Sequence, residues 1–213
     1  MKITLFGATG KTGKCLIDEG QRRDIDLTVF ARTETPFEHD GVRIVRGELT
    51  DMALLRKAVH GADAVLSALG PTSLKHPADL PITRATSAIL AAMAAEDVVR
   101  FVAVSTGTAV DPCDGFDWRI WAPAQLIRIV MPNSHRDIIG LARAVRTSAA
   151  DWTLVRAGFL KDTAAAHCIN VGLYGQTKHT LTLSRRDLAA FMFDQVGSPE
   201  WIRKAPGIST QAP

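Results

Sequence analysis

Three glycines recur at every third position near the start of the chain, directly after a short apolar run. The segment Gly7-Ala8-Thr9-Gly10-Lys11-Thr12-Gly13 follows Ile3-Thr4-Leu5-Phe6 and precedes a helix-forming stretch over residues 14–19. A strand that runs into a glycine-rich turn and then a helix is the geometry that holds the pyrophosphate of a dinucleotide. The helix N-terminus offers free N–H groups and a positive dipole end to the anion. A glycine triplet alone can also be a structural turn that binds nothing, but its place at the start of a strand–helix–strand pattern favours nucleotide binding.

The residue types in this loop suit separate tasks. Gly7 permits a tight turn, Gly10 lets the backbone approach the phosphates, and Gly13 lets the helix pack close to the strand. The spacing differs from the commoner G-x-G-x-x-G pattern. We expect cofactor contacts from the whole loop, which also contains Thr9, Lys11 and Thr12.

An arginine follows the second predicted strand, at position 32. In a dinucleotide fold this position faces the adenosine ribose, where an acidic residue binds a free 2′-hydroxyl and an arginine accommodates a 2′-phosphate. The guanidinium of Arg32 can pair with a phosphate through two hydrogen bonds. Thr33 can add a hydroxyl donor, whereas Glu34 would repel a phosphate unless it points away. We therefore expect NADP(H) rather than NAD(H) as the cofactor.

Two further segments follow predicted strands at the same edge of the sheet. Glu48 and Leu49 come after the third strand and are expected beside the adenine, whereas Thr50 or Asp51 suits the N-cap of the next helix. After the fourth strand, Ala68-Leu69-Gly70 brings small residues to the carboxyl edge, as a closely approaching cofactor requires.

Apolar runs that predict strands alternate along the chain with stretches that predict helices. The predicted strands are 2–6, 27–31, 42–45, 64–67, 99–105 and 152–156. The predicted helices are 10–23, 51–59, 78–96, 134–150 and about 186–197. Near-continuous apolar strands joined by crossovers of helical length indicate a parallel sheet covered on both faces. We predict an α/β fold with a Rossmann-like, doubly wound parallel sheet, as a single domain over residues 1–213.

Two segments, at about 107–133 and 157–183, interrupt this alternation of strands and helices. The first contains three prolines and an aromatic cluster, and the second is predicted to form a hairpin with strands around 168–173 and 179–183. Both follow strands at their carboxyl ends, where open α/β sheets bind ligands. We interpret them as a lid over a substrate; the alternative is a cover for the sheet edge or an oligomer contact. Residues 203–207 are predicted to form a loose surface segment.

The aromatic cluster of the first segment consists of Phe116, Trp118 and Trp121. The two tryptophans are three residues apart and could share one face of a helix. They could form the apolar wall for a flat ring, or they could simply pack the lid against the rest of the protein. Both interpretations stay open.

Composition excludes several other classes of function. A net charge of +3 over 213 residues lacks the dense basic stripe that nucleic-acid binding requires. The longest apolar stretch, 88–95, is too short to span a bilayer, and a first strand at residue 2 leaves no room for a signal peptide. The three cysteines and six histidines show no disulfide or metal-ligand spacing. We expect a cytoplasmic monomer or small homo-oligomer with a small-molecule partner and with no metal, nucleic acid or membrane partner.

Several motifs occur in an order that is more specific than any one of them. They are residues 7–13, Arg32, 47–51, 67–70, 104–107, 152–158 and 184–189. With this order, to about residue 195, the chain resembles an atypical short-chain dehydrogenase/reductase of the NAD(P)H-binding, NmrA-like type. It is most similar to the flavin reductase/biliverdin-IXβ reductase group. Most of these relatives carry proline where this chain has Ala157, and the segment 107–132 does not match closely.

The resemblance implies an NADPH-dependent reductase that passes a hydride to a flavin, a quinone or another flat conjugated acceptor. It places Arg32 at the 2′-phosphate and Ser105 and Thr106, our catalytic candidates, beside the nicotinamide. Such chemistry needs little from the protein, because the cofactor carries the hydride and the acceptor need only be stacked with water excluded. The remaining expected contacts are Ala157 and Gly158 to the cofactor, and Trp118, Trp121 and Phe159 to the substrate. An alternative of another class is an NADP(H)-binding regulatory module that senses the cofactor without turnover.

The segment Tyr174-Gly175-Gln176-Thr177-Lys178 spells the Y-x-x-x-K pattern in which a lysine activates a proton-donating tyrosine. That pairing requires both residues on one face of a helix that soon follows the catalytic serine. Here the tyrosine lies 69 residues after Ser105, and the glycines at 172 and 175 favour a turn. We interpret Tyr174 as a hairpin residue rather than a catalytic acid.

Overall fold

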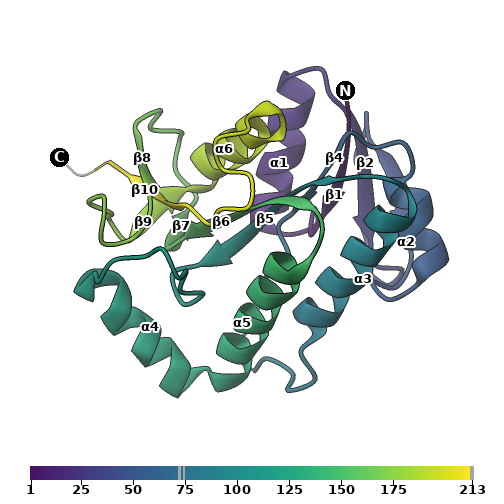
Figure 1. The fold of residues 1–213 in the computed structure, drawn as a ribbon. Coiled ribbons are helices and arrows are strands. Elements are labelled where there is room, and N and C mark those ends of the chain that lie inside the picture. Colours follow the sequence, from purple (N-terminus) through teal and green to yellow (C-terminus); the bar gives the residue numbers. More distant parts are fainter. Residues whose placement is uncertain (72, 74, 212–213) are drawn as a thin grey trace.

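A sheet of eight strands runs through the molecule, with helices on both of its faces (Figure 1). The computed structural model describes residues 1–71, 73 and 75–211. In spatial order the strands are β3 (Arg43–Arg46), β2 (Asp26–Ala31), β1 (Lys2–Phe6), β4 (Ala64–Ser67), β5 (Arg100–Thr106), β6 (Asp151–Ala157), β10 (Gly207–Thr210) and β8 (Ile169–Gly172). The pairs between neighbours are parallel except for β10 and β8.

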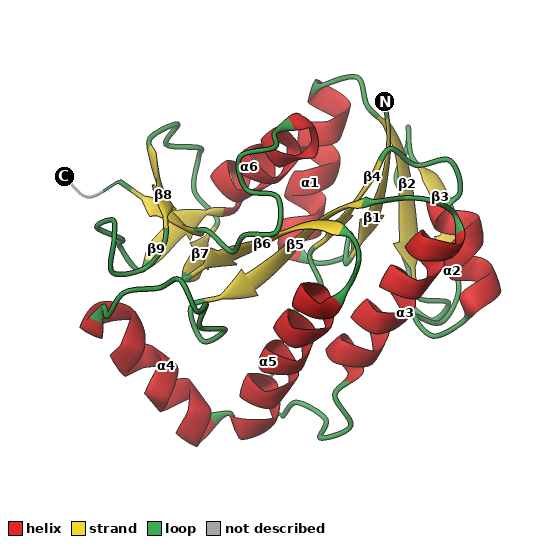
Figure 2. Ribbon diagram, in the orientation of Figure 1, coloured by secondary structure: helices red, strands yellow, loops and turns green. Residues whose placement is uncertain are grey.

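Helices form a layer on each side of this sheet (Figure 2). One layer holds α1 (Lys11–Arg22) and α6 (Arg185–Gly197), and the other holds α2 (Met52–Val59), α3 (Pro81–Ala95) and α5 (Pro132–Thr147). The remaining helix, α4 (Trp118–Val130), lies beside α5 and extends away from the sheet. Two short strands, β7 (Phe159–Lys161) and β9 (Thr182–Ser184), pair with each other in parallel.

The strand order reverses direction between β1 and β4. From β1 the chain adds β2 and β3 on one side and then β4, β5 and β6 on the other. This reversal is the mark of a doubly wound sheet, and ligands of such sheets bind at the carboxyl ends of the strands where the order reverses. Phe6 of β1 pairs with Ser67 of β4, so the residues after these two strands emerge side by side. The predicted fold class is confirmed.

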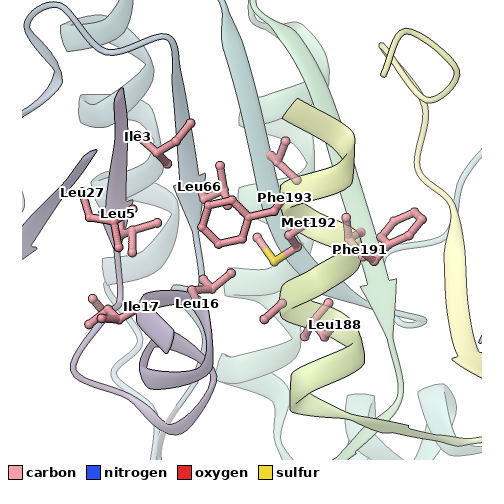
Figure 3. Close-up of a cluster of buried hydrophobic side chains, with 14 of the residues drawn as sticks. Ile3, Leu5, Leu16, Ile17, Leu27, Leu66, Leu188, Phe191, Met192 and Phe193 are labelled. Carbon is pink, nitrogen blue, oxygen red and sulfur yellow. The ribbon is translucent and has the colours of Figure 1, made fainter. Parts of the chain in front are cut away.

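Alternation along the strands gives each helical layer its own core. Ile3 and Leu5 of β1 point into the cluster beneath α1 and α6 (Figure 3), whereas Phe6 belongs to the cluster beneath α2, α3 and α5. On α1 the inward residues recur at helical spacing, and Leu16 and Ile17 are fully buried. On both faces of the sheet, side chains that recur every second residue in the strands therefore pack against side chains that recur about every 3.6 residues in the helices.

A buried carboxylate from α5 caps the start of α3. The N-cap residue of α3, Leu80, has no side-chain oxygen, and the Asp137 carboxylate accepts N–H bonds from Ile82 (3.0 Å) and Thr83 (2.8 Å) in its place. His76 Nε2 lies 2.6 Å from the same carboxylate. Burial raises the pKa of Asp137, but the hydrogen bonds from His76, Thr83 and Ile82 outweigh it and hold the pKa below its usual value. The cap fixes α5 against α3.

Replacing Asp137 with Asn should lower the free energy of unfolding by about 2–4 kcal/mol, because several hydrogen bonds to a buried charge are weakened. The loss should depend on pH. A carboxyl whose folded pKa is depressed stabilises the fold above its unfolded pKa, near 3.8, and this contribution is lost as the pH falls through the folded value. Urea unfolding at pH 7 and at about pH 3 measures the difference. The exposed Asp79→Asn change is the control, and an equal loss at both pH values would contradict the assignment.

The structure corrects two predictions about the second half of the chain and adds one helix that was not predicted. The predicted hairpin at 168–173 and 179–183 is wrong: β8 pairs with β10, and β9 pairs with β7. The segment 203–207 is not loose, because Pro206 O accepts the Arg156 N–H (2.9 Å) and the chain continues into β10 of the main sheet. Within 107–133 the chain forms α4 despite Pro123. In each case a tertiary contact overrides the local signal.

Candidate functional site

The glycine-rich loop lies against the residues that follow β4. Gly7 has a φ of +75°, and a Cβ there would lie 2.7 Å from the carbonyl carbon of Ala68. A Cβ at Gly13 would lie 2.3 Å from the Cα of Ala8. Glycine is required at both positions, so the loop has the tight turn and the close helix packing that its sequence predicts. The structure thus brings together the loop and the segment 68–70.

The N-terminus of α1 is open to an anion. Its N-cap is Gly10, which has no side chain to occupy the first-turn amides of Lys11, Thr12 and Gly13. Thr9 is half-buried in the loop just before them. These N–H groups and the positive end of the helix dipole fit a pyrophosphate.

Two cations and a carboxylate stand beside this helix end. Lys11 Nζ lies 3.0 Å from Asp162 Oδ2, and Arg185 Nη1 lies 2.5 Å from Asp162 Oδ1. The hydrogen bond from Lys11 and the charge of Arg185 lower the pKa of Asp162. Neither Asp162 nor Arg185 was identified from the sequence as a site residue, although Arg185 lies within the motif 184–189.

The residues expected at the adenosine end lie at the carboxyl ends of β2 and β3. Arg32 and Thr33 are exposed directly after β2, and Arg32 forms no ion pair with any described residue. Arg46 at the end of β3 donates to Thr35 O (3.1 Å) and so shapes the loop that follows Arg32. Glu34 is also exposed in this loop. The Arg32 guanidinium is thus available for a phosphate.

The residues after β3 leave one side chain at the sheet edge, pack a second into the core and cap helix α2. Glu48 is exposed at this edge, and Leu49 packs against the second core cluster. Asp51 Oδ1 accepts the N–H of Leu54 (3.1 Å), so Asp51 rather than Thr50 is the N-cap of α2.

An apolar cavity of about 360 Å³ opens at the carboxyl ends of β5 and β6. Its lining comes from the strand ends and the residues after them (Thr106, Ala157, Gly158), from α4 (Ile120, Pro123, Ile127) and from α5 (Ser134, His135, Ile138). The glycine-rich loop stands at the same sheet edge. Most of the wall is apolar, so the cavity suits a hydrophobic ring better than a charged ligand.

The two catalytic candidates are placed differently. Thr106 lines the cavity, and its Oγ1 lies 2.6 Å from Thr108 Oγ1. Ser105 is buried on β5, outside the cavity wall, and its hydroxyl has no hydrogen-bond partner among the described residues. Sequence reasoning missed Ser134 and His135, which α5 brings to the cavity. Burial, followed by the charge of Arg128, lowers the pKa of His135 and favours the neutral ring.

The three expected substrate contacts do not come together. Phe159 lines both the cavity and a neighbouring hollow, and Trp118 lines the hollow alone. Trp121 lines neither of the two, and its ring centroid lies 6.4 Å from that of Phe116. Both tryptophans are exposed, and neither lines the cavity next to Thr106.

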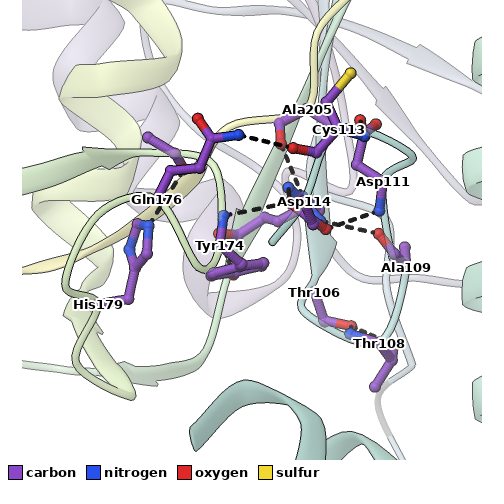
Figure 4. A network of polar contacts seen from close by, with 12 residues as sticks. Thr106, Thr108, Ala109, Asp111, Cys113, Asp114, Tyr174, Gln176, His179 and Ala205 are labelled. Atoms are coloured by element: carbon purple, nitrogen blue, oxygen red, sulfur yellow. Dashed lines mark hydrogen bonds and ion pairs between the residues drawn. The ribbon is translucent and has the colours of Figure 1, made fainter. Parts of the chain in front are cut away.

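A buried ion pair ties together the loops around the cavity (Figure 4). Arg156 of β6 is fully buried and binds Asp114 through both terminal nitrogens, at 2.5 and 2.7 Å. Its Nε donates to Ala205 O (2.8 Å), and Nη1 donates to Ala109 O (3.3 Å). Arg156 is the single charged residue in a mostly apolar predicted strand, and no role was predicted for it from the sequence.

Tyr174 packs on this ion pair. Its ring lies 4.5 Å from the Arg156 guanidinium carbon, and its hydroxyl donates to Arg156 O (3.0 Å). Burial raises the pKa of the Tyr174 hydroxyl far above its ordinary value. Residues 174–177 form a turn, which places Lys178 outside any helix shared with Tyr174. The geometry agrees with a structural tyrosine.

Replacing Arg156 with Met should lower the free energy of unfolding by about 3–5 kcal/mol, because Asp114 is left buried without its partner. The exposed Arg203→Met change is the matched control and should stay within about 0.5 kcal/mol of the unchanged protein. Denaturant unfolding measures both. Similar losses in the two variants would show that the buried pair contributes no more to the free energy of unfolding than an exposed arginine does.

Two comparisons with known sequences bear on the whole site. A family model described as NAD(P)H-binding matches residues 7–199. An isoflavone reductase-like protein of Olea europaea is 29% identical over 169 residues, which is 74% of this chain and 48% of that protein. The chain spans about half the length of the curated relatives it matches.

Solved structures share the fold. A short-chain dehydrogenase/reductase of Veillonella parvula DSM 2008 in complex with NADP gives a TM-score of 0.77 at 18% identity, covering 99% of this chain and 95% of that one. ChuY of Escherichia coli O157:H7, described as an anaerobillin reductase, gives 0.77 at 16% identity over 100% of both chains. The structural matches show the fold alone. The family match spans most of the ordered motifs, and the resemblance predicted from the sequence is confirmed.

The part of the chain that the structure describes contains no group of three or more His, Cys, Asp or Glu side chains placed to hold a metal ion. None of its helices combines the length and apolar character needed to cross a bilayer.

Proposed function

The chain belongs to the NAD(P)H-binding family, and we propose that it is an NADPH-dependent reductase of a flat conjugated acceptor such as a flavin or quinone. The observation that carries this proposal is the apolar cavity beside Thr106 and Ala157, on the same sheet edge as the open N-terminus of α1. A dinucleotide held along this edge has its anion at α1 and leaves the cavity for an acceptor. Two of the similar proteins carry reductase names, which supports the same class of reaction.

The residues that would hold NADPH are those of the carboxyl edge. The amides of Lys11, Thr12 and Gly13 fit the pyrophosphate, and Arg32 fits the 2′-phosphate. When bound, NADPH supplies the hydride. The protein contributes position and a dry environment, which is the role of the aliphatic wall formed by α4 and α5.

Polar groups at the cavity can orient an acceptor and exchange a proton with it. Thr106 and Thr108 share a hydrogen bond of 2.6 Å, so each hydroxyl can donate while the other accepts. His135 of α5 also lines the cavity, and its lowered pKa favours the neutral ring. Tyr174 contributes its ring to the wall, while its hydroxyl is committed to Arg156 O.

The proposal is tested by following NADPH consumption with FMN, riboflavin and a simple quinone, with NADH in parallel. Oxidation of NADPH that depends on an acceptor supports the reductase. Tight NADPH binding with no acceptor reduced would favour the regulatory alternative, in which the protein senses the cofactor without turnover.

Arg32→Ala should weaken NADPH binding by about 1.5–3 kcal/mol, the range for a hydrogen bond to a charged group. NADH binding should change much less, since NADH lacks the 2′-phosphate. Arg43→Ala, an exposed arginine at the opposite end of the sheet, is the matched control. Titration calorimetry with both cofactors measures the effect, and equal losses for NADPH and NADH would refute the role of Arg32.

Tyr174→Phe should retain most of the reductase activity, because its hydroxyl is buried and holds Arg156 O. Thr106→Ala should reduce kcat more strongly, because Thr106 lines the cavity and its hydroxyl is hydrogen-bonded to that of Thr108. General acid catalysis is typically worth about 10²–10⁴ in rate. A loss of that size in Tyr174→Phe, with NADPH affinity preserved, would identify Tyr174 as the proton donor after all.

A further inference from the structure

Helix α4 is apolar on both of its sides but buried on only one. Ile120, Pro123 and Ile127 face the cavity. The opposite side carries Trp118, Trp121, Leu126, Ile129 and Val130, all of them exposed. Ala124 is the one described residue of α4 that is buried. A broad apolar helix face that is left uncovered normally packs against another part of a protein or lies on a membrane surface.

The exposed apolar side chains are gathered rather than scattered. Among the described residues, six of the twelve large hydrophobic side chains that are exposed lie between positions 116 and 130. Their exposed fractions run from 54% for Trp121 to 77% for Phe116. Single exposed hydrophobic residues are ordinary on protein surfaces, whereas a contiguous patch marks an interaction site.

The charges around this patch are positive. Over residues 116–136 the basic side chains are Arg119, Arg128 and Arg136, and none of them forms an ion pair with a described carboxylate. Asp117 is the acidic residue of this segment, and its half-buried carboxylate accepts the backbone N–H of Arg119 at the start of α4. A second copy of the chain would bring the same arginines together, which is unfavourable. An anionic surface complements them.

The patch is continuous with the cavity. The neighbouring hollow is bordered by Trp118 and Leu126 on the outer side of α4, and it shares Pro123, Phe159 and Leu181 with the cavity. An apolar molecule on the outer surface of α4 is therefore adjacent to the space beside Thr106.

We propose that Phe116 and α4 dock on an anionic phospholipid bilayer, and that the cavity takes a lipophilic conjugated acceptor, of the quinone class, from that bilayer. The acceptor part rests on the proposed reductase function, whereas the docking part stands on the patch and its charges alone. The absence of a spanning helix among the described residues is compatible with docking, because an interfacial helix lies in the plane of the surface. The composition-based expectation of no membrane partner is thereby revised.

Vesicle flotation tests the docking without cofactor or acceptor. The protein should float with vesicles of phosphatidylcholine containing phosphatidylglycerol, bind less to pure phosphatidylcholine, and be released by high salt. The double change Ile129→Glu, Val130→Glu should weaken binding about tenfold or more, by removing apolar contact and adding charges that the lipid repels. Val99→Glu, at an exposed valine just before β5 and so at the opposite edge of the sheet, is the control and should bind normally.

Three results would overturn the docking: no binding to anionic vesicles, an equal loss in Val99→Glu, or a stable dimer in sedimentation that the Ile129→Glu, Val130→Glu variant dissolves. The last would make a second copy the occupant. NADPH oxidation then tests the acceptor. The double variant should reduce a water-soluble quinone normally and lose activity with a long-chain quinone in vesicles. If neither quinone is reduced, the reductase function fails while the flotation result stands.

Discussion

The buried pair of Arg156 and Asp114 holds the carboxyl edge of the sheet in place. Arg156 sits at the end of β6, where it binds the loop that follows β5 through Asp114 and Ala109 and the segment before β10 through Ala205. Tyr174 adds the turn after β8 to the same centre. Removing two charges from water is expensive, and only this density of hydrogen bonds compensates for it. Three loops of distant sequence thus share one anchor, and Tyr174 connects that anchor to the cavity wall.

The two ends of the candidate cofactor site depend on different kinds of interaction. At α1 the backbone decides: Gly7 has a positive φ, the glycines have no side chains, and the amides of the first turn have no partner within the helix. Such features leave a clear mark on the sequence as glycines at fixed positions. At the cavity the determinants are packing contacts between α4, α5 and the strand ends. These contacts depend on how the two helices pack against the ends of β5 and β6, and no local sequence pattern encodes that packing.

This difference explains which predictions succeeded. The strands of the first half and their helices were found within one to three residues, because each buries an apolar face with a regular period. The short strand β10 carried no such pattern and follows Pro206, so only its pairing with β6 and β8 reveals it. α4 was missed because Pro123 and an apolar surface without polar alternation resemble a loop. Arg156 was overlooked because its partners, Asp114 and Ala205, are more than 40 residues away in the sequence. Ser134 and His135 were overlooked because only the packing of α5 brings them to the cavity.

The junction of α4 and α5 gives the cavity a mechanical asymmetry. Met131 ends α4 and Pro132 begins α5, and Met131 departs from helical geometry with ψ of 58°. α5 is tied to α3 through Asp137, whereas Ala124 is the one described residue of α4 that is buried. The side of the cavity that carries His135 therefore rests on the contact between α5 and α3, and we expect the side that carries Ile127 to yield first to a larger acceptor.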